Sequence, residues 1–393
     1  MKTILIHIGS FKAGGAEKSL ISLLNCLPKD QYNIDVLVFN QTGLFSQLVP
    51  THVNVIEADF PYKYLNIPIS NIKSYIKAPI IIFKKIKSYL LSTQNKELAI
   101  QQSIWDQWRN SIPPMKKDYD IAISYLEGIT NYFIIEKVKA NKKIIWVHNE
   151  YNKLNYNKDY DLKYFKQADK IITISETCES DLKENFPSLS SKIQVLANIS
   201  DEKLIKKLAE TKEEDANFNP SLSCLKLLTI GRFTPQKNYP LLLDTAKELQ
   251  DRNVNFKWFI IGDGPLKKDI IKKIQSLNLN DKVYLLGLKS NPYYFMKQSD
   301  IIVQTSLFEG KSIVLDEAKI LCKPIVSTDY PTVYDAIKDK ETGIISKMNA
   351  TSLSEDIIKL ATSDLFRKIP QNLQSTTTNN LTEINNYIKI LEE

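Results

Sequence analysis

Two successive series of alternating strand-like and helix-like segments constrain the fold of this chain more than any other feature. A parallel sheet requires this alternation, because each strand needs a crossover, usually a helix, before its parallel neighbour can pair. The polar, charged stretch 201–223 lies between the two series and is predicted to be an interdomain linker. We therefore expect an α/β protein with two Rossmann-like, doubly wound domains that face each other across a cleft.

The expected elements of the first series are strands at 3–9, 34–39, 53–57, 120–125, 143–147, 170–174 and 192–195, with helices near 16–27, 79–92, 127–138 and 176–185. Those of the second are strands at 225–230, 256–261, 282–286, 300–304, 324–327 and 343–346, with helices near 239–251, 265–277, 312–321 and 351–361. The length of 393 residues suffices for two or three domains. We place the domains at 1–205 and 206–370, followed by a final helical segment at 371–393.

The composition excludes several classes of protein. The chain is 43% hydrophobic and 25% charged, and no apolar run approaches the ~20 residues that cross a bilayer. Its N-terminus enters a strand directly, without the pattern of a signal peptide. The four cysteines form no C-x-x-C pair and the three histidines are dispersed, which favours a reducing cytoplasm and predicts no zinc site.

An acidic segment follows the apolar run 301–303, where Glu309 and Glu317 stand eight residues apart. A strand, a short loop and a helix N-terminus form a common anion site, because free N–H groups and the helix dipole both favour negative charge. Eight helical residues rise about 12 Å, more than the separation of about 5–9.5 Å between the paired carboxylates of a glycosidase. The spacing favours two contacts with one long ligand over a shared bond-breaking step.

A basic loop follows the short apolar strand 227–230. Arg232 and Lys237 stand five residues apart in it, and Pro235 constrains the turn between them. A diphosphate is matched by such a pair, because a guanidinium makes bidentate contacts and an ammonium acts as a point charge. On its own a basic loop is usually solvated, so the prediction depends on the acidic segment in the same half of the chain.

Adjacent glycines mark a third segment. Gly14 and Gly15 follow the first strand and precede a helix, where they would allow close approach of the backbone to a ligand. The dinucleotide fingerprint G-x-G-x-x-G is absent there, and Gly262 and Gly264 lack its third glycine. We interpret the second pair as a tight turn.

In this order, the segments resemble the retaining glycosyltransferases of family 4, which have the GT-B fold. The resemblance covers residues 1–60 and 118–365. The matching segments are Gly14-Gly15-Ala16-Glu17, Trp146-Val147-His148-Asn149, Gly231-Arg232 with Lys237, Gly262-Asp263-Gly264-Pro265, and Glu309 with Glu317. The resemblance implies an acceptor domain at 1–205, a nucleotide-sugar donor domain at 206–370 and a last helix that crosses back to the first domain.

The resemblance also implies roles for four catalytic candidates. Arg232 and Lys237 would neutralise the diphosphate of the donor and the charge that develops on its leaving group. Glu309 would contact the donor sugar, and His148 would contact sugar hydroxyls near the reacting carbon. Glu317 would accept hydrogen bonds from the ribose and belongs with the donor-binding candidates.

Main-chain segments complete the donor-binding set, which also contains Gly14, Gly15, Gly231, Leu288, Lys311, Ser312 and Ile313. The N–H groups of 311–313 would face a phosphate or sugar hydroxyls, and the main chain at 287–288 would border the base. The first two glycines would approach the diphosphate or the acceptor, or form only a tight turn. Lys311 replaces a small or apolar residue common in the family, and would meet either a donor with an added negative group or only solvent.

Three further residues have weaker interpretations. Glu17 fits an acid in the first turn of a helix better than a catalytic group. Ser306 could cap the loop that holds Glu309. Glu127 opens a helix at a strand end and suggests an acceptor contact only weakly.

Residues 61–100 contain seven lysines and one glutamate, a net charge of +6. The predicted helix within 72–91 is basic and amphipathic, which indicates peripheral contact with an anionic membrane or, alternatively, a core-facing helix with solvated lysines. No nucleic-acid module accompanies these lysines, so nucleic acid is not an expected partner.

No metal is expected. Asp118-Tyr119-Asp120 and Asp159-Tyr160-Asp161 resemble the D-x-D of another glycosyltransferase fold, but its partner motifs are absent and we interpret both as chance. Arg232 and Lys237 would supply the positive charge, and no cofactor is expected because the nucleotide-diphosphate sugar is a substrate.

These features predict a retaining, metal-independent hexosyltransferase that uses a nucleotide-sugar donor and a glycan or polyprenyl-linked acceptor. Its expected setting is capsule or other surface polysaccharide biosynthesis in a bacterium, in the cytoplasm at the inner face of the cell membrane. A non-catalytic nucleotide-sugar-binding partner of a synthase complex is the main alternative. A Rossmann oxidoreductase and an epimerase of the same fold fit less well.

Overall fold

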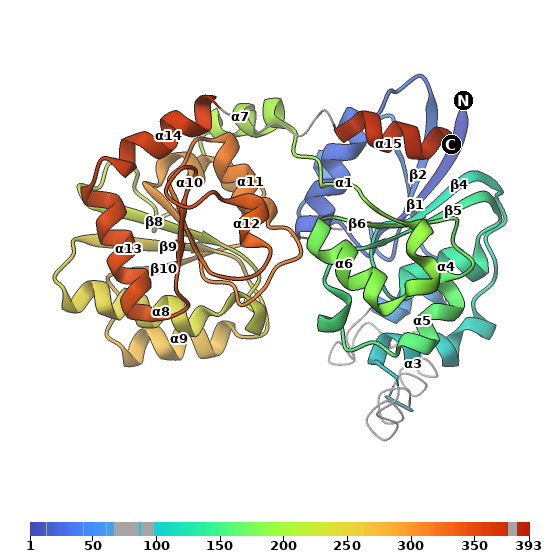
Figure 1. Ribbon diagram of the computed structural model, residues 1–393, viewed down its shortest axis with the longest axis horizontal. Coiled ribbons are helices and arrows are strands. Elements are labelled where there is room, and N and C mark those ends of the chain that lie inside the picture. Colours follow the sequence, from blue (N-terminus) through green and yellow to red (C-terminus); the bar gives the residue numbers. More distant parts are fainter. Residues whose placement is uncertain (13, 42, 60, 67–85, 88–97, 376–382) are drawn as a thin grey trace. The chain divides into compact units, whose positions relative to one another are not determined.

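A computed structural model describes the chain except for residues 13, 42, 60, 67–85, 88–97 and 376–382 (Figure 1). The chain forms two compact units: unit 1 comprises Met1–Ile199 with Glu383–Glu393, and unit 2 comprises Ser200–Thr382. The predicted helix 79–92 and the membrane contact predicted at 72–91 fall outside the described residues, except for 86–87.

Unit 1 contains a seven-stranded parallel sheet. Its strands lie in the order β3 (Asn54–Glu57), β2 (Tyr32–Val38), β1 (Lys2–His7), β4 (Tyr119–Ser124), β5 (Ala140–Val147), β6 (Lys170–Thr173) and β7 (Ile193–Val195). Ile4 pairs with Ile34 on one side and Ile121 on the other. The strand order therefore reverses at β1, and doubly wound sheets bind ligands beside such a reversal, at the carboxyl ends of the strands.

Successive side chains of β1 pack on opposite faces of this sheet, as the period of a strand dictates. Ile4 and Ile6 border a small apolar cavity under α1 (Gly15–Cys26) and α15 (Glu383–Glu392). Leu5 belongs to the core on the other face, which is covered by α3 (Ile100–Trp108), α4 (Ile129–Lys137) and α5 (Lys158–Phe165). One further helix, α6 (Glu176–Asn185), follows β6.

The last helix of the chain, α15, packs on unit 1. The Tyr387 ring stacks on Trp146 at a centroid distance of 6.2 Å, and the Tyr387 hydroxyl donates to the Ala197 carbonyl at 3.1 Å. Lys2 Nζ donates to the Leu391 carbonyl at 3.2 Å, and Lys142 Nζ donates to the Ile390 carbonyl. Lysines from the starts of two strands thus satisfy the carbonyls at the C-terminal end of the helix, where the dipole favours positive charge.

Unit 2 contains a six-stranded parallel sheet. The order is β10 (Val283–Gly287), β9 (Phe256–Ile261), β8 (Leu225–Ile230), β11 (Ile301–Gln304), β12 (Ile325–Thr328) and β13 (Ile344–Ser346). One face packs on α8 (Tyr239–Asp251), α9 (Lys267–Ser276), α13 (Ala350–Thr362) and α14 (Leu365–Ser375). The other packs on α10 (Pro292–Gln298), α11 (Ile313–Ile320) and α12 (Val333–Ala336). The predicted α/β class with two doubly wound sheets is confirmed.

The predicted linker 201–223 is wrong in its first half, because Glu202–Glu210 forms helix α7. Asp201 caps this helix by accepting a hydrogen bond from the Leu204 N–H at 3.1 Å. Ile205 and Ala209, spaced by one helical turn, are buried against Tyr293 and Ile320. The charged residues that suggested a linker lie around this narrow apolar stripe.

The segment after α13 also differs from the prediction. The expected boundary at 370 falls inside α14, which spans Pro370 and buries Ile369 and Leu373 in the core of unit 2. The helical segment expected at 371–393 therefore begins within α14 and ends with α15.

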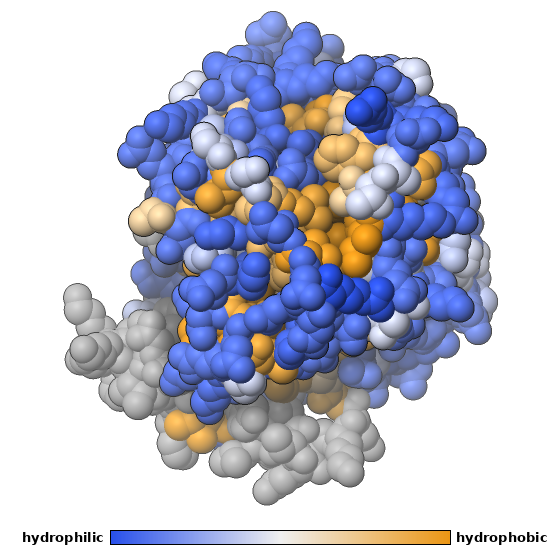
Figure 2. Space-filling view, turned by 90° about the vertical axis from the view of Figure 1, so that its left-hand side faces the viewer, coloured by the Kyte–Doolittle hydropathy of each residue, from blue (hydrophilic) through white to orange (hydrophobic). Residues whose placement is uncertain are grey.

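The face shown in Figure 2 is mainly hydrophilic, and hydrophilic side chains enclose a central apolar area. No helix among the described residues combines the length and the apolar character that a membrane span requires.

Candidate functional site

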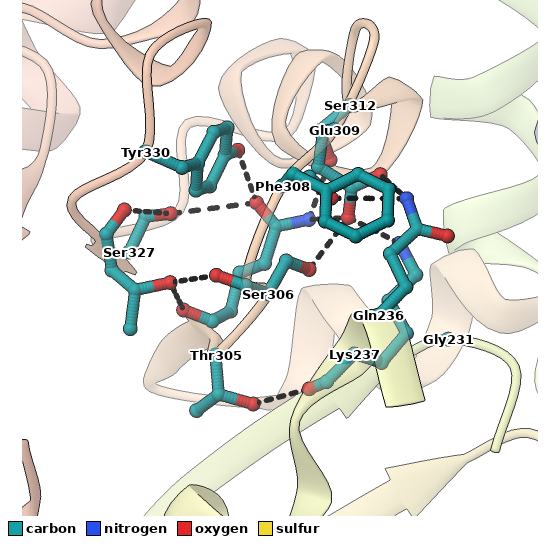
Figure 3. A network of polar contacts seen from close by, with 12 residues as sticks. Gly231, Gln236, Lys237, Thr305, Ser306, Phe308, Glu309, Ser312, Ser327 and Tyr330 are labelled. Carbon is teal, nitrogen blue, oxygen red and sulfur yellow. Dashed lines mark hydrogen bonds and ion pairs between the residues drawn. The ribbon is translucent and has the colours of Figure 1, made fainter. Parts of the chain in front are cut away.

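Two loops at the carboxyl ends of the adjacent strands β8 and β11 are joined by several hydrogen bonds (Figure 3). The Leu307 N–H donates to the Gln236 carbonyl, and the Thr305 hydroxyl donates to the Lys237 carbonyl, both at 2.8 Å. The Gln236 side-chain amide also donates to the Phe308 carbonyl at 2.9 Å. The basic loop and the acidic segment, whose bonded residues are 68 and 72 positions apart in the sequence, therefore form one structural unit.

The Glu309 carboxylate is the centre of this network (Figure 3). Its Oε1 accepts from Lys237 Nζ and from the Ser306 hydroxyl, each at 2.5 Å, and its Oε2 accepts from Gln236 Nε2 at 3.2 Å. Gln304 Nε2 lies 3.4 Å from Oε1. The side chains of Glu309 and Lys237 are only 8% and 17% exposed, so the ion pair is largely withdrawn from water and depends on this full set of donors.

The two cations of the basic loop differ in their surroundings. Lys237 is paired with Glu309, whereas Arg232 is exposed, and among the described residues none forms an ion pair or a hydrogen bond with its guanidinium. From the sequence, both cations were predicted to contact a diphosphate. The structure instead has a fixed ammonium and a guanidinium that is accessible to an anion.

A second set of polar side chains fixes the acidic segment through hydrogen bonds. Gln304 Nε2 donates to the Ser312 hydroxyl, and Gln304 Oε1 accepts from the Tyr330 hydroxyl, both at 2.7 Å. The Thr332 hydroxyl donates to the Glu309 carbonyl at 2.8 Å. Gln304 and Tyr330 were not predicted from the sequence as site residues, although polar residues directly after an apolar strand are a signal for such a role.

Helix α11 begins at this network. Ser312 is its N-cap residue, but the Ser312 side chain does not cap the helix, and its hydroxyl accepts from Gln304 instead. The N–H groups of the first turn of α11, where Ile313 lies, therefore keep no side-chain cap, which favours an anion near them.

Lys311 is partly buried beside α11 rather than extended into solvent. Its Nζ lies 3.6 Å from the Asp316 carboxylate, which also pairs with Lys319 at 2.8 Å. Asp316 thus serves two lysines, and the three side chains together retain one positive charge.

Glu317 is buried in unit 2, with 1% of its surface exposed. Its Oε1 accepts a hydrogen bond from the Tyr293 hydroxyl at 2.8 Å. Burial, and then the negative charge of Glu317, raise the pKa of Tyr293 well above its usual range, so Tyr293 remains a donor. The two glutamates of the motif therefore have separate sets of protein partners.

Close backbone packing explains the glycines near β8 and β9. A Cβ on Gly262 would lie 1.9 Å from the Gly231 carbonyl oxygen, and a Cβ on Gly264 would lie 2.7 Å from the Phe233 carbonyl oxygen. The second glycine pair thus allows the basic loop to pack against the end of β9. Leu288, 48% exposed, follows Gly287, which has a φ of +71°.

In unit 1, the Glu17 carboxylate lies against the glycine turn after β1. Gly14 is the N-cap residue of α1, and a Cβ on it would lie 2.1 Å from Glu17 Oε2. Gly15 is exposed at the first position of the helix. Glu17 therefore folds back over the turn in the first turn of the helix, where the dipole favours a negative charge.

His148 follows β5 and is 7% exposed. Its ring lies 5.3 Å from the ring of Tyr125, which stacks on Trp146 at 5.3 Å. Burial lowers the pKa of His148, opposed by the charge of Glu127 and by a hydrogen bond with the Tyr125 backbone. The ring is therefore neutral at pH 7, and its buried Nε2 has no hydrogen-bond partner among the described residues.

Two doubly wound parallel-sheet units, with a basic loop joined to an acidic segment at the carboxyl ends of one sheet, fit the GT-B fold that was predicted from the sequence. Residues 210–379 match the family described as glycosyl transferases group 1. The predicted resemblance to the family 4 glycosyltransferases is thereby confirmed, whereas a retaining reaction stays a prediction.

Two curated relatives extend this result. An uncharacterized glycosyltransferase of Methanocaldococcus jannaschii is 33% identical over 223 residues, and the alignment spans 55% of each chain, so the match covers only about half of that relative. The N-acetylgalactosamine-N,N'-diacetylbacillosaminyl-diphospho-undecaprenol 4-alpha-N-acetylgalactosaminyltransferase of Campylobacter jejuni is 24% identical, over 96% of this chain and 94% of its own length.

Solved structures share the fold over the whole chain. The crystal structure of Anabaena HepE in complex with UDP and glucose has a TM-score of 0.70 at 17% identity, and covers 99% of both chains. A structure of Staphylococcus aureus TarM in complex with UDP has a TM-score of 0.68 at 16% identity, and covers 100% of both chains. Among the described residues, no group of three or more His, Cys, Asp or Glu side chains has the arrangement of a metal site.

Proposed function

We propose that the protein is a retaining glycosyltransferase that moves a hexose from a nucleotide-diphosphate sugar to a glycan or polyprenyl-linked acceptor. We further propose that it acts in the assembly of a bacterial surface polysaccharide. The observation that carries this proposal is the exposed Arg232 beside the fixed Lys237–Glu309 pair, at the carboxyl ends of β8 and β11. Relatives of this chain suggest the substrate classes, because one is named as a transferase acting on a diphospho-undecaprenol carrier and another was solved in complex with UDP and glucose.

The two cations would stabilise the leaving group. Arg232 can make bidentate contacts with a diphosphate, and Lys237 contributes a positive charge in a largely buried position, where it acts more strongly than in water. The uncapped first turn of α11, with the N–H groups of Lys311, Ser312 and Ile313 nearby, would bind a phosphate or sugar hydroxyls. This positive charge from side chains and backbone underlies our proposal of a metal-independent reaction.

Other residues would orient the donor. Glu309 Oε2 accepts from only one protein side chain, Gln236, among the described residues, and so retains capacity for a sugar hydroxyl. Glu317 would accept from the ribose, and the main chain at Leu288 would border the base. In unit 1, the neutral His148 would accept a hydrogen bond from a sugar hydroxyl, with Gly14 and Gly15 near the phosphates or the acceptor.

In the proposed step, the acceptor hydroxyl attacks the anomeric carbon on the face from which the diphosphate departs. The bond between the anomeric carbon and the phosphate oxygen breaks as the bond to the acceptor oxygen forms. The proton of the acceptor passes to the leaving phosphate. Arg232 and Lys237 offset the negative charge that accumulates there, and the configuration of the anomeric carbon is retained.

A thermal-shift screen across nucleotide sugars, followed by a transfer assay with the best binder, tests the proposal. At one hundred times its dissociation constant the donor should stabilise the fold by about 2.7 kcal/mol. Arg232→Ala should lower kcat by about 10²–10³ with little change in stability, whereas the matched change Lys268→Ala on the exposed side of α9 should do neither. NMR of the product determines the anomeric configuration.

The outcomes separate the alternatives. Binding of a nucleotide sugar without transfer to any glycan or polyprenyl acceptor would favour the non-catalytic partner of a synthase complex. If no nucleotide sugar binds, the whole proposal is wrong.

A further inference from the structure

Glu127 joins the ends of two neighbouring strands in unit 1. It lies between the end of β4 and the start of α4, and both of its carboxylate oxygens accept hydrogen bonds from the residues that follow β5. Oε2 accepts from the His148 N–H at 3.0 Å, and Oε1 accepts from Asn149 Nδ2 at 2.7 Å. The carboxylate therefore fixes both the backbone and a side chain of the turn that presents His148.

An ordinary helix-capping role does not account for this geometry. The N-cap residue of α4 is Gly128, and α4 has no side-chain cap. Glu127 precedes the N-cap and directs its carboxylate to the neighbouring strand end instead. The acid is placed for the turn after β5, not for its own helix.

Glu127 is itself held in place. Gly128 has a φ of +86°, a conformation that favours glycine, and a Cβ there would lie 2.1 Å from Gln101 Oε1. Gln101 Oε1 accepts from the Ile129 N–H at 3.3 Å, and the Thr130 hydroxyl donates to the Leu126 carbonyl at 2.5 Å. The turn that carries Glu127 is thus constrained on both sides.

The His148 ring is the group that the turn after β5 positions. A hydrogen bond with the Tyr125 backbone occupies one ring nitrogen, and the aromatic rings of Tyr125 and Trp146 pack alongside. The other nitrogen, Nε2, is buried and has no partner among the described residues. In a neutral ring that carries its proton on the other nitrogen, Nε2 is an acceptor, and a buried acceptor without a donor marks a place for a ligand hydroxyl.

We propose that Glu127 is a positioning residue for sugar transfer: its carboxylate fixes the turn after β5 so that His148 Nε2 is presented to a sugar hydroxyl of a substrate. The proposal rests on the proposed transferase function. It assigns no proton transfer to Glu127, which acts only through His148 and Asn149. An error of about 1 Å in the placement of such a group can cost about 10²-fold in rate.

Three substitutions separate positioning from chemistry. Glu127→Ala removes both hydrogen bonds and should lower kcat by about 10–10², with the KM for the donor nearly unchanged, because neither hydrogen bond involves a residue proposed to bind the diphosphate or the nucleotide. Glu127→Gln keeps one acceptor oxygen, and its amide can donate to a rotated Asn149 amide, so it should retain kcat within about threefold. Glu127→Asp is too short to reach both partners and should fall between the two.

The double substitution with His148→Ala tests the route of the effect. If Glu127 acts through His148, adding Glu127→Ala to His148→Ala should lower kcat by less than about threefold more. Glu176→Gln is the matched control, an exposed acid at the start of α6 after β6, and should leave kcat unchanged. Fully multiplicative effects, or a Glu127→Gln loss as large as that of Glu127→Ala, would overturn the proposal.

Amide hydrogen exchange and NMR of the His148 ring test the proposal without a transfer reaction. Loss of the hydrogen bond to the His148 N–H should speed its amide hydrogen exchange in Glu127→Ala and not in Glu127→Gln, and should shift the ring ¹⁵N resonances of His148. Unchanged exchange and ring resonances in a folded Glu127→Ala protein contradict the proposal even if no donor is found. Absence of transfer by the wild-type protein instead argues against the proposed function itself.

Discussion

The polar groups at the strand ends differ between the two units: those considered in unit 2 are charged, and the one in unit 1 is neutral. In unit 2, Lys237 and Glu309 are oppositely charged, largely buried and supported by Ser306 and Gln236. In unit 1, the position after β5 holds a neutral histidine among aromatic rings, with a nitrogen that lacks a partner among the described residues. The first arrangement suits a ligand with fixed charge, and the second suits a ligand that offers a hydroxyl.

The difference also predicts how each unit responds to perturbation. A buried ion pair is sensitive to the removal of either charge, because the remaining charge is then desolvated without a partner. A buried neutral histidine is instead sensitive to acid, because protonation creates a charge in a site that cannot solvate it. Substitution should therefore be the sharper test of unit 2, and pH the sharper test of unit 1.

The largest effect is expected from Lys237→Ala. It leaves the Glu309 carboxylate largely buried without its cation, and should lower the free energy of unfolding by about 3–5 kcal/mol. Urea denaturation measures this loss. Adding Glu309→Gln should restore most of the stability but none of the transfer activity, because the cation is still missing. A double variant no more stable than Lys237→Ala would show that the ion pair does not stabilise unit 2.

Acid should affect unit 1 through His7. This residue is fully buried, and its ring nitrogens contact the Leu37 carbonyl at 2.9 Å and the Tyr62 hydroxyl at 2.6 Å. Burial lowers the pKa of His7 from 6.5 to about 4. Between these values the unfolded chain binds the proton and the folded chain does not, so stability falls as the pH falls, by up to about 3 kcal/mol.

Denaturation between pH 7 and pH 4 checks this prediction by comparing wild type with His7→Gln. The difference between the two free energies of unfolding should change across the window, which isolates His7 from other groups. Asp161, whose pKa is raised chiefly by burial, contributes with the opposite sign in both proteins. Parallel pH profiles would mean that His7 does not titrate as its burial implies.

The features of the molecule differ in how far they could be predicted from the sequence. The alternation of segments was enough for the fold class, because a parallel sheet has few other solutions. The motif around Glu309 and Lys237 was visible because it lies at strand ends in recognisable order. The charge pattern of 202–210 was misleading, since the helix there is fixed by a single turn of contacts between Ile205, Ala209 and Tyr293.

Partnerships across strand ends could not be predicted from the sequence. Glu127 was a weak candidate until its hydrogen bonds to His148 and Asn149 were apparent, and these depend on the register of β4 against β5. The link between Gln304 and Tyr330 similarly needs the alignment of β11 with β12. Sequence spacing identifies residues of the right chemistry, whereas sheet register decides which of them meet.

A smaller effect is expected from Tyr293→Phe in unit 2. The substitution removes a hydrogen bond to the buried Glu317 carboxylate and should lower the free energy of unfolding by about 1.5–3 kcal/mol. Tyr294→Phe, the adjacent buried tyrosine of α10, is the matched control and should have little effect. Calorimetry of nucleotide binding should also show weaker affinity only in Tyr293→Phe, because Glu317 loses a group that orients it. Equal effects of the two substitutions would mean that Glu317 does not contribute to donor binding.

The smallest effect on stability, and the finest test of the contrast between charged and neutral recognition, is expected from Lys311→Met. Lys311 is 19% exposed, and Asp316 keeps Lys319 as a closer partner, so the free energy of unfolding should change by less than about 1 kcal/mol. The three side chains retain one positive charge beside Glu309, which suits a donor sugar with a carboxylate. If Lys311 contacts such a group, the preference for a uronic acid donor over the matching neutral hexose should fall about tenfold, or about 1.4 kcal/mol. Competition assays with the two donors measure this ratio. An unchanged ratio would restrict Lys311 to its ion pair with Asp316, and unit 2 would then recognise charge only at the diphosphate.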